Sequence, residues 1–102
     1  MSLHLPDDLL AARIRECVLD LLDQRGPGHS ICPSEAARAL AVRFGGRWQD
    51  LMRPVRTVAI ALAQAGRIEA IQHETVVNLD EVRGPVRLRL RCLPGRRNSY
   101  AA

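Results

Sequence analysis

The chain has 102 residues and a mass of 11.3 kDa, which is the size of one domain. Its 47% hydrophobic and 25% charged residues are typical of a globular domain, and its single Phe, Tyr and Trp argue against a base-stacking platform for single-stranded nucleic acid. We find no run of about 18 apolar residues. The N-terminal residues do not form a signal-peptide pattern either, so we expect a cytoplasmic protein that does not enter membranes.

Charge is distributed unevenly along the chain. All 15 basic residues are Arg, and the formal net charge is +4. Residues 1–42 carry a net charge of −2, whereas residues 43–102 carry +6. Because the planar guanidinium group donates paired hydrogen bonds to phosphate and to guanine, the basic second part predicts a side of the molecule that faces a polyanion.

The first helix is expected over residues 7–24. Apolar side chains recur there every three or four residues, which places them on one face of a helix. Asp7 and Asp8 add negative charge at the N-terminal end, where the helix dipole favours it. Gly26-Pro27 ends the helix, because Gly adopts positive φ and Pro does not continue a helix. A short extended segment over residues 29–32 follows.

Two further helices are expected over residues 33–42 and 48–65, separated by a glycine-containing turn. Pro33 suits the first turn of a helix, where its missing N–H is not needed. Glu35 stands where the carboxylate of a capping box is found. Pro54 is expected to interrupt or restart the third helix, whose apolar positions recur at steps of four and three.

After residue 66 the apolar period changes from about 3.6 to 2. Residues 68–72 predict one strand. Residues 86–92 predict a second strand, in which Arg alternates with apolar side chains. The connection over residues 73–85 is too long for a tight hairpin, and residues 79–82 favour a helical turn within it.

This order of elements is that of a winged helix-turn-helix domain, an α+β fold with three helices and a small antiparallel β-wing. We expect the domain to span residues 1–93 and to be followed by a flexible basic tail over residues 94–102. Its predicted core consists of apolar residues on the inward faces of the helices and strands: Ile14, Val18, Leu21, Leu40, Leu51, Val55, Val58, Leu62, Ile68, Leu88 and Leu90.

Several segments within residues 8–91 resemble a family of short bacterial proteins of unknown function that is assigned to the winged-helix superfamily. The resemblance implies a winged-helix fold and no particular activity, substrate or catalytic residue. The chain departs from the family pattern at His73–Val82, where a shorter polar turn is typical. The similar segments are Ser30–Arg38, Trp48–Met52, Val55-Arg56, Ala65–Glu69 and Arg83–Leu88.

The third predicted helix supplies the first candidate site, because in DNA-binding helix-turn-helix domains this helix lies in the major groove. Arg side chains there contact guanine, Gln contacts adenine, and Thr contacts a phosphate or a thymine methyl group. A solvated face is the alternative, and the apolar Ala59–Ala63 stretch would equally suit a protein interface. With the apolar side buried, the opposite side presents Arg53, Thr57, Ile60, Ala61 and Gln64, with Arg56 on its flank.

The last predicted strand supplies the second candidate site. Arg87, Arg89 and Arg91 alternate along it, with Arg83 nearby. At strand spacing these three arginines form a cationic stripe about 13 Å long, which suits the phosphate backbone of DNA. The alternative is a charged outer face that discourages edge-to-edge pairing of strands.

No catalytic or metal-binding pattern stands out. Cys17, Cys32 and Cys92 are odd in number and widely spaced, which predicts reduced thiols, and Cys17 and Cys92 occupy apolar positions. His29 and Cys32 have ligand-like spacing without the second pair that a tetrahedral metal site needs. We therefore expect a binding protein rather than an enzyme, without metal, cofactor or small-molecule substrate. Duplex DNA is the expected partner; the alternative is a protein-interaction module.

Overall fold

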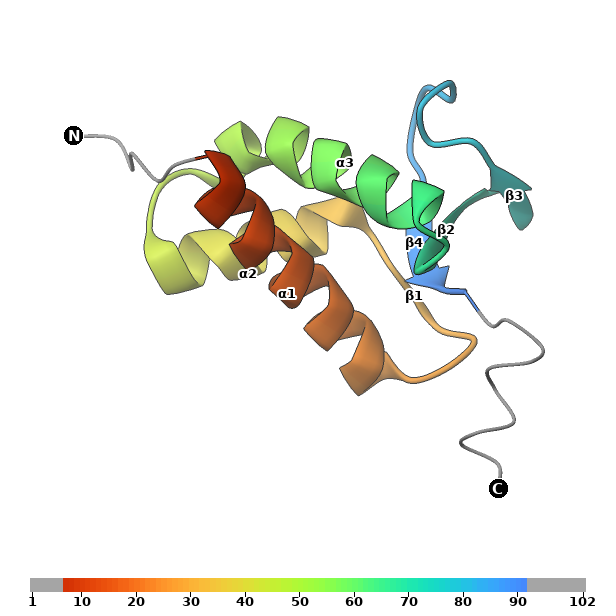
Figure 1. Ribbon diagram of the computed structural model, residues 1–102, viewed down its shortest axis with the longest axis horizontal. Coiled ribbons are helices and arrows are strands. Elements are labelled where there is room, and N and C mark those ends of the chain that lie inside the picture. The colour runs from red at the N-terminus through yellow and green to blue at the C-terminus, as the bar shows by residue number, and fades with distance from the viewer. Residues whose placement is uncertain (1–6, 92–102) are drawn as a thin grey trace.

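The computed structural model describes residues 7–91 and has an α+β fold, in which three helices are followed by a four-stranded antiparallel sheet. The three helices confirm the predicted ranges to within two residues at each end. The predicted tail and Cys92 lie outside the described residues. The elements, shown in Figure 1, are α1 (Asp7–Arg25), β1 (Ser30–Ile31), α2 (Pro33–Phe44), α3 (Trp48–Gln64), β2 (Ile68–Gln72), β3 (Thr75–Val77) and β4 (Arg87–Leu90).

A local hydrogen bond fixes the start of α2, whereas core packing keeps α3 continuous through its proline. The backbone N–H of Cys32 donates to Glu35 Oε1 at 3.0 Å, which confirms the predicted capping role of Glu35. The predicted break at Pro54 is wrong, because α3 runs continuously through it. Leu51 and Val55 flank this proline and pack into the core, which offsets the hydrogen bond that Pro54 removes.

The sheet has the strand order β1-β4-β2-β3, and it lies at the end of the helices near the C-terminal end of α3 (Figure 1). The last described strand, β4, pairs with β1 on one side and with β2 on the other. It is shorter than the predicted strand over residues 86–92. Because β4 is a central strand, the suggestion that its arginines discourage edge pairing is wrong.

A tight hairpin joins β2 to β3, and this corrects the expectation that residues 73–85 form one long connection. Gln72 pairs with Thr75, so His73 and Glu74 alone make the turn. Both have positive φ, at 52° and 65°, as a type I′ hairpin requires. The chain then returns to β4 through residues 78–86, which we call the wing loop. The predicted helical turn within it is confirmed, since the N–H groups of Glu81 and Val82 both donate to the Asn78 carbonyl.

The core lies between the three helices and the inner face of the sheet. The predicted core residues are buried except for Leu21, Leu51 and Leu90, which are partly buried. The prediction missed Ile31 in β1 and Leu79 in the wing loop, which are both buried because they fold onto this core. Across residues 7–91, no helix has the combination of length and apolar character needed to cross a bilayer.

Candidate nucleic-acid interface

The outer face of α3 carries three of the predicted contact residues, Arg53, Thr57 and Gln64, and all three are exposed. Their spacing places them on one side of the helix, with Arg53 and Gln64 about 16 Å apart along its axis. The Thr57 hydroxyl donates to the Arg53 carbonyl at 3.1 Å, so its lone pairs stay available to an outside donor. This face therefore presents polar groups along about three helical turns.

The apolar part of α3 is more deeply placed than the sequence suggests. Ala59 is buried, and Ile60, which was expected on the exposed face, is half-buried against the core. The wing loop folds over this part of the helix, and Ile60 lines a shallow pocket with loop residues from Leu79 to Gly84. Within the Ala59–Ala63 stretch, two side chains are therefore buried (Ala59 and Leu62), two are half-buried and Ala61 is exposed.

Arg56 is turned toward the protein itself. Its Nη2 group donates to the carbonyl of Val82 at 2.7 Å and to that of Leu79 at 3.3 Å. Both acceptors belong to the wing loop, so this arginine joins α3 to the loop. No sequence pattern signals such a role, because the acceptors are main-chain carbonyls that lie 23 and 26 residues away.

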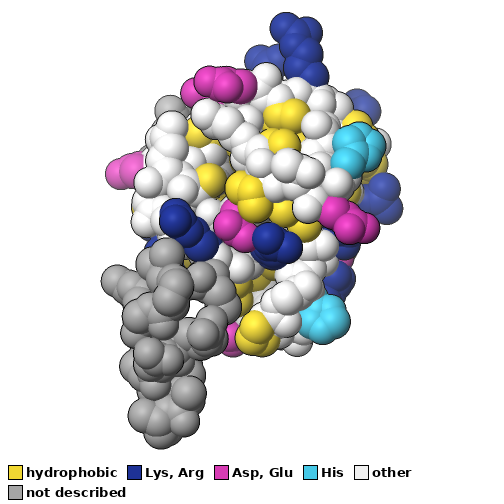
Figure 2. Space-filling model, turned by 90° about the vertical axis from the view of Figure 1, so that its right-hand side faces the viewer, with side chains coloured by type: hydrophobic (Ala, Val, Ile, Leu, Met, Phe, Trp, Pro, Cys, Tyr) yellow, Lys and Arg dark blue, Asp and Glu magenta, His cyan; other side chains and the backbone are white. Residues whose placement is uncertain are grey.

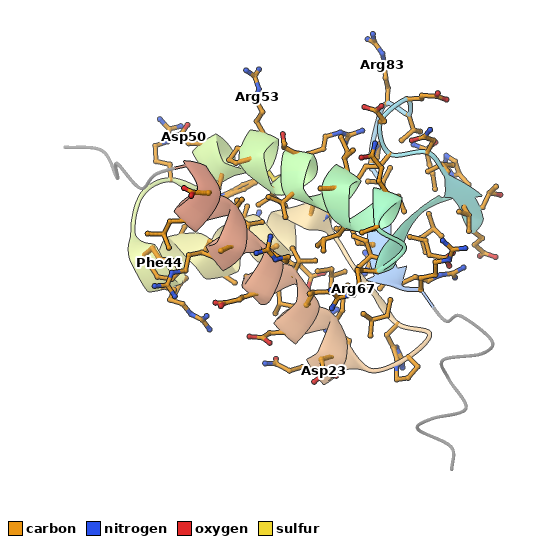
Figure 3. The ribbon with its side chains drawn as sticks, in the orientation of Figure 1. Asp23, Phe44, Asp50, Arg53, Arg67 and Arg83 are labelled. Atoms are coloured by element: carbon orange, nitrogen blue, oxygen red, sulfur yellow. The ribbon has the colours of Figure 1, made fainter. Side chains whose placement is uncertain are left out.

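Arg83 stands on the wing loop and is exposed. Figure 3 shows that Arg83 and Arg53 project on the same side of the molecule, although they come from different elements. Neither guanidinium group lies within ion-pairing distance of a carboxylate among the described residues. Acidic groups stand on the same two elements: Asp50 on the first turn of α3, and Asp80 with Glu81 on the loop. The combined face is therefore mixed in charge.

Two of the three arginines that were predicted to form a cationic stripe bind neighbouring residues of the protein. Arg89 Nε donates to Glu69 Oε1 at 2.8 Å, across the β4–β2 pair. Arg87 donates to the Ser30 hydroxyl at 2.6 Å and to its carbonyl at 2.9 Å. Arg91 remains exposed. Figure 2, which views this end of the molecule, shows acidic and apolar side chains among the arginines.

Glu35 joins three parts of the fold. Its carboxylate forms an ion pair with Arg25 at the end of α1 and accepts the Cys32 N–H, and Arg87 of β4 lies 3.9 Å away. Desolvation acts to raise the pKa of Glu35, but the Cys32 N–H and the guanidinium groups of Arg25 and Arg87 outweigh it and hold that pKa below its usual value. Arg87 therefore belongs to the group of ion pairs that joins α1, α2 and β4.

Both aromatic rings of the described residues are covered by arginine. The Arg38 guanidinium lies 4.3 Å from the centre of the Trp48 ring, and that of Arg13 lies 5.6 Å from the centre of the Phe44 ring. Trp48 and Phe44 are also partly buried against the core. These rings are consequently poor stacking surfaces for unpaired bases.

The model of a family described as "Protein of unknown function (DUF3253)" matches residues 11–91. The chain belongs to the DUF3253 family. This match confirms that the chain resembles a family of unknown function over most of its length, whereas the assignment of that family to the winged-helix superfamily stays a prediction. Comparison with curated proteins finds no match.

In this DUF3253 protein the two described cysteines are free thiols in different surroundings. Cys17 is buried in α1, and its Sγ donates to the Ala36 carbonyl at 3.8 Å. Burial raises the pKa of this thiol, although the charge of Arg43 opposes the shift. Cys32 accepts the Ser34 hydroxyl at 3.2 Å. Within the described part of the chain, no three His, Cys, Asp or Glu side chains gather as a metal ion requires.

Proposed function

We propose that this DUF3253 protein is a winged-helix protein that binds double-stranded DNA through the outer face of α3 and the wing loop. The observation that carries the proposal is that Arg53 and Arg83 project on one side of the molecule from these two elements (Figure 3). In helix-turn-helix domains the corresponding third helix lies in the major groove. A loop beside that helix is then close to the sugar-phosphate backbone.

The exposed groups divide between the two kinds of contact that such an interface uses. Arg83 is suited to a phosphate, because it carries a full charge at the tip of a loop. Arg53 and Gln64 have the donors and acceptors that recognise guanine and adenine edges, and Thr57 suits a phosphate or a thymine methyl group. Arg91, exposed after β4, adds charge at the sheet end of the same protein.

Two observations favour duplex DNA over the other partners. A single-stranded nucleic acid needs exposed rings, whereas the Trp48 and Phe44 rings already lie against arginines. A protein partner needs apolar surface on α3, whereas Ala59 and Leu62 are buried and Ile60 is half-buried. The polar face that remains suits a groove lined with phosphates.

The acidic groups beside this face set the expected strength of binding. Asp50, Asp80 and Glu81 reduce the positive potential around Arg53 and Arg83. We therefore expect a dissociation constant of about 10⁻⁴ to 10⁻⁶ M at physiological salt, the range of non-specific DNA binding. Binding tightens at lower salt, because each phosphate contact releases counterions.

The test is a titration of a fluorescent DNA duplex with the full chain at several salt concentrations, read by anisotropy. In the variant R53Q/R83Q, the slope of log K against log salt is expected to fall by about 0.9, because Arg83 is the phosphate contact that is lost, whereas the loss of Arg53 alters sequence preference. The matched control R15Q/R67Q removes the same charge from exposed positions elsewhere. It is expected to leave the slope unchanged.

Two results would contradict the proposal. One is the absence of duplex binding by the unmodified chain at the lowest salt tested. The other is equal slopes for R53Q/R83Q and the unmodified chain, which would remove this face from the interface. A single-stranded oligonucleotide that binds more tightly than the duplex would redirect the proposal to a different nucleic acid.

A further inference from the structure

We propose that Arg56 and Gln72 are positioning residues for DNA binding, which clamp the wing loop from both sides and thereby fix the place of Arg83 relative to Arg53. This inference rests on the proposed function. Neither residue needs to touch the DNA, because both act on the main chain of the loop. Arg56 is thus distinguished from Arg53, the other arginine of α3, by what it binds.

The first side of the clamp comes from α3. Arg56 lies one turn after Arg53 on the same helix, and its Nη2 group donates to Val82 at 2.7 Å and to Leu79 at 3.3 Å. Arg56 is half-buried, so these bonds are partly shielded from water. A charged donor to a main-chain carbonyl is stronger than a neutral one. The helical half of the proposed interface therefore holds the loop directly.

The second side of the clamp comes from β2. Gln72 Nε2 donates to the carbonyl of Arg83 at 2.8 Å and to that of Pro85 at 3.1 Å. The first of these acceptors belongs to the very residue proposed to contact phosphate. Gln72 is also the last residue before the tight β2–β3 turn, so the sheet gives it a defined position.

The loop between these clamps has internal order of its own. Asn78 accepts the N–H groups of Glu81 and Val82 at its carbonyl and that of Asp80 at its side-chain oxygen, all within 3.1 Å. Buried side chains anchor both ends of the loop, Leu79 at the start and Val86 at the finish. The loop is therefore preorganised, and Arg83 loses little conformational freedom when it meets a phosphate.

The experiment compares four single variants that remove or keep the donors. R56M and Q72M keep an unbranched side chain without donors, R56K keeps a charged donor, and R53M makes the same chemical change at an exposed site one turn away. Amide hydrogen exchange of Asp80, Glu81 and Val82 is measured by NMR on the DNA-free protein. We expect exchange to rise about tenfold in R56M and Q72M, to be largely restored in R56K, and to stay unchanged in R53M.

A second measurement asks whether Arg56 acts through Arg83. In the unmodified background, R83Q is expected to lower the salt slope of duplex binding by about 0.9. In the R56M background the same change is expected to have no effect on the slope, because Arg83 is no longer held at the backbone. R53M/R83Q is the control, in which R83Q still lowers the slope by about 0.9.

The outcomes separate the clamp from the proposed function. Unchanged loop exchange in both R56M and Q72M overturns the clamp, and so does an undiminished effect of R83Q in the R56M background. If the unmodified chain binds no duplex, the proposed function fails, and the clamp is then supported by raised exchange or refuted by unchanged exchange. If R56M does not fold, Q72M carries the same two measurements.

Discussion

Replacing Leu62 with Ala tests the assignment of the inner face of α3. Leu62 is 4% exposed and belongs to the core between the helices and the sheet. The substitution removes three carbon groups at about 0.8 kcal/mol each, or about 2.4 kcal/mol of transfer free energy. The cavity that is left adds to this loss, so we expect a total of about 2–5 kcal/mol. For a domain of this size the melting temperature then falls by roughly 10–20 °C.

Urea unfolding measures this loss, with the fluorescence of Trp48 as the signal. Trp48 is the only tryptophan of the chain and is partly buried beside the core, so its emission reports on the folded state. The matched control is V42A on α2, where the side chain is 88% exposed and the expected change is within about 0.5 kcal/mol. A loss below about 0.5 kcal/mol for L62A would show that the inner face of α3 has been assigned wrongly.

Three further outcomes are expected. Because the folded-state pKa of Glu35 is lowered, its contribution to stability is present above about pH 4.3 and is lost as the pH falls through the folded-state pKa. In a plot of urea unfolding midpoints against pH, E35Q is therefore expected to lose less stability at acid pH than the unmodified chain. An equal loss in both proteins would contradict this. Cys17 is buried and its pKa is raised, so we expect iodoacetamide to alkylate it far more slowly in the native protein than in urea. Peptide mass mapping measures the two rates, and equal rates would place Cys17 at the surface. A double-mutant cycle with E69Q and R89Q yields a coupling of about 0.2–1 kcal/mol in urea unfolding, and zero coupling would mean the pair is not formed in solution.

The sequence predicted the helices well because their signals are local. Apolar spacing and the Glu35 cap act within a few residues, and the structure places them as expected. The β2–β3 hairpin was missed because its turn, His73-Glu74, lacks the Asn-Gly or Asp-Gly pair that usually marks positive φ. The break predicted at Pro54 was wrong for the opposite reason. Proline usually interrupts a helix, but core packing on both sides of Pro54 keeps α3 continuous.

The candidate site was predicted in part. Helix periodicity shows which side chains of α3 are exposed, whereas the partners of the strand arginines depend on how the strands pair. Arg53 was placed correctly on the outer face of α3 by its spacing from the buried positions. The pairing of Arg89 with Glu69 needs the β4–β2 register, which no local pattern specifies. The hydrogen bonds of Arg56 could not be predicted at all, because their acceptors are main-chain carbonyls, which every residue type has.

The central position of β4 has a consequence for how the chain acquires its fold. Among the strands of residues 7–91, β1 pairs with β4 alone, and the bonds between Ser30 and Arg87 span 57 residues. While the chain emerges from a ribosome, the three helices are complete long before this strand appears. Until then Ile31 lacks the strand with which it pairs, and one edge of β2 stays unpaired. We expect the nascent domain to depend on protection by chaperones or the ribosome surface until the residues of β4 are free to insert.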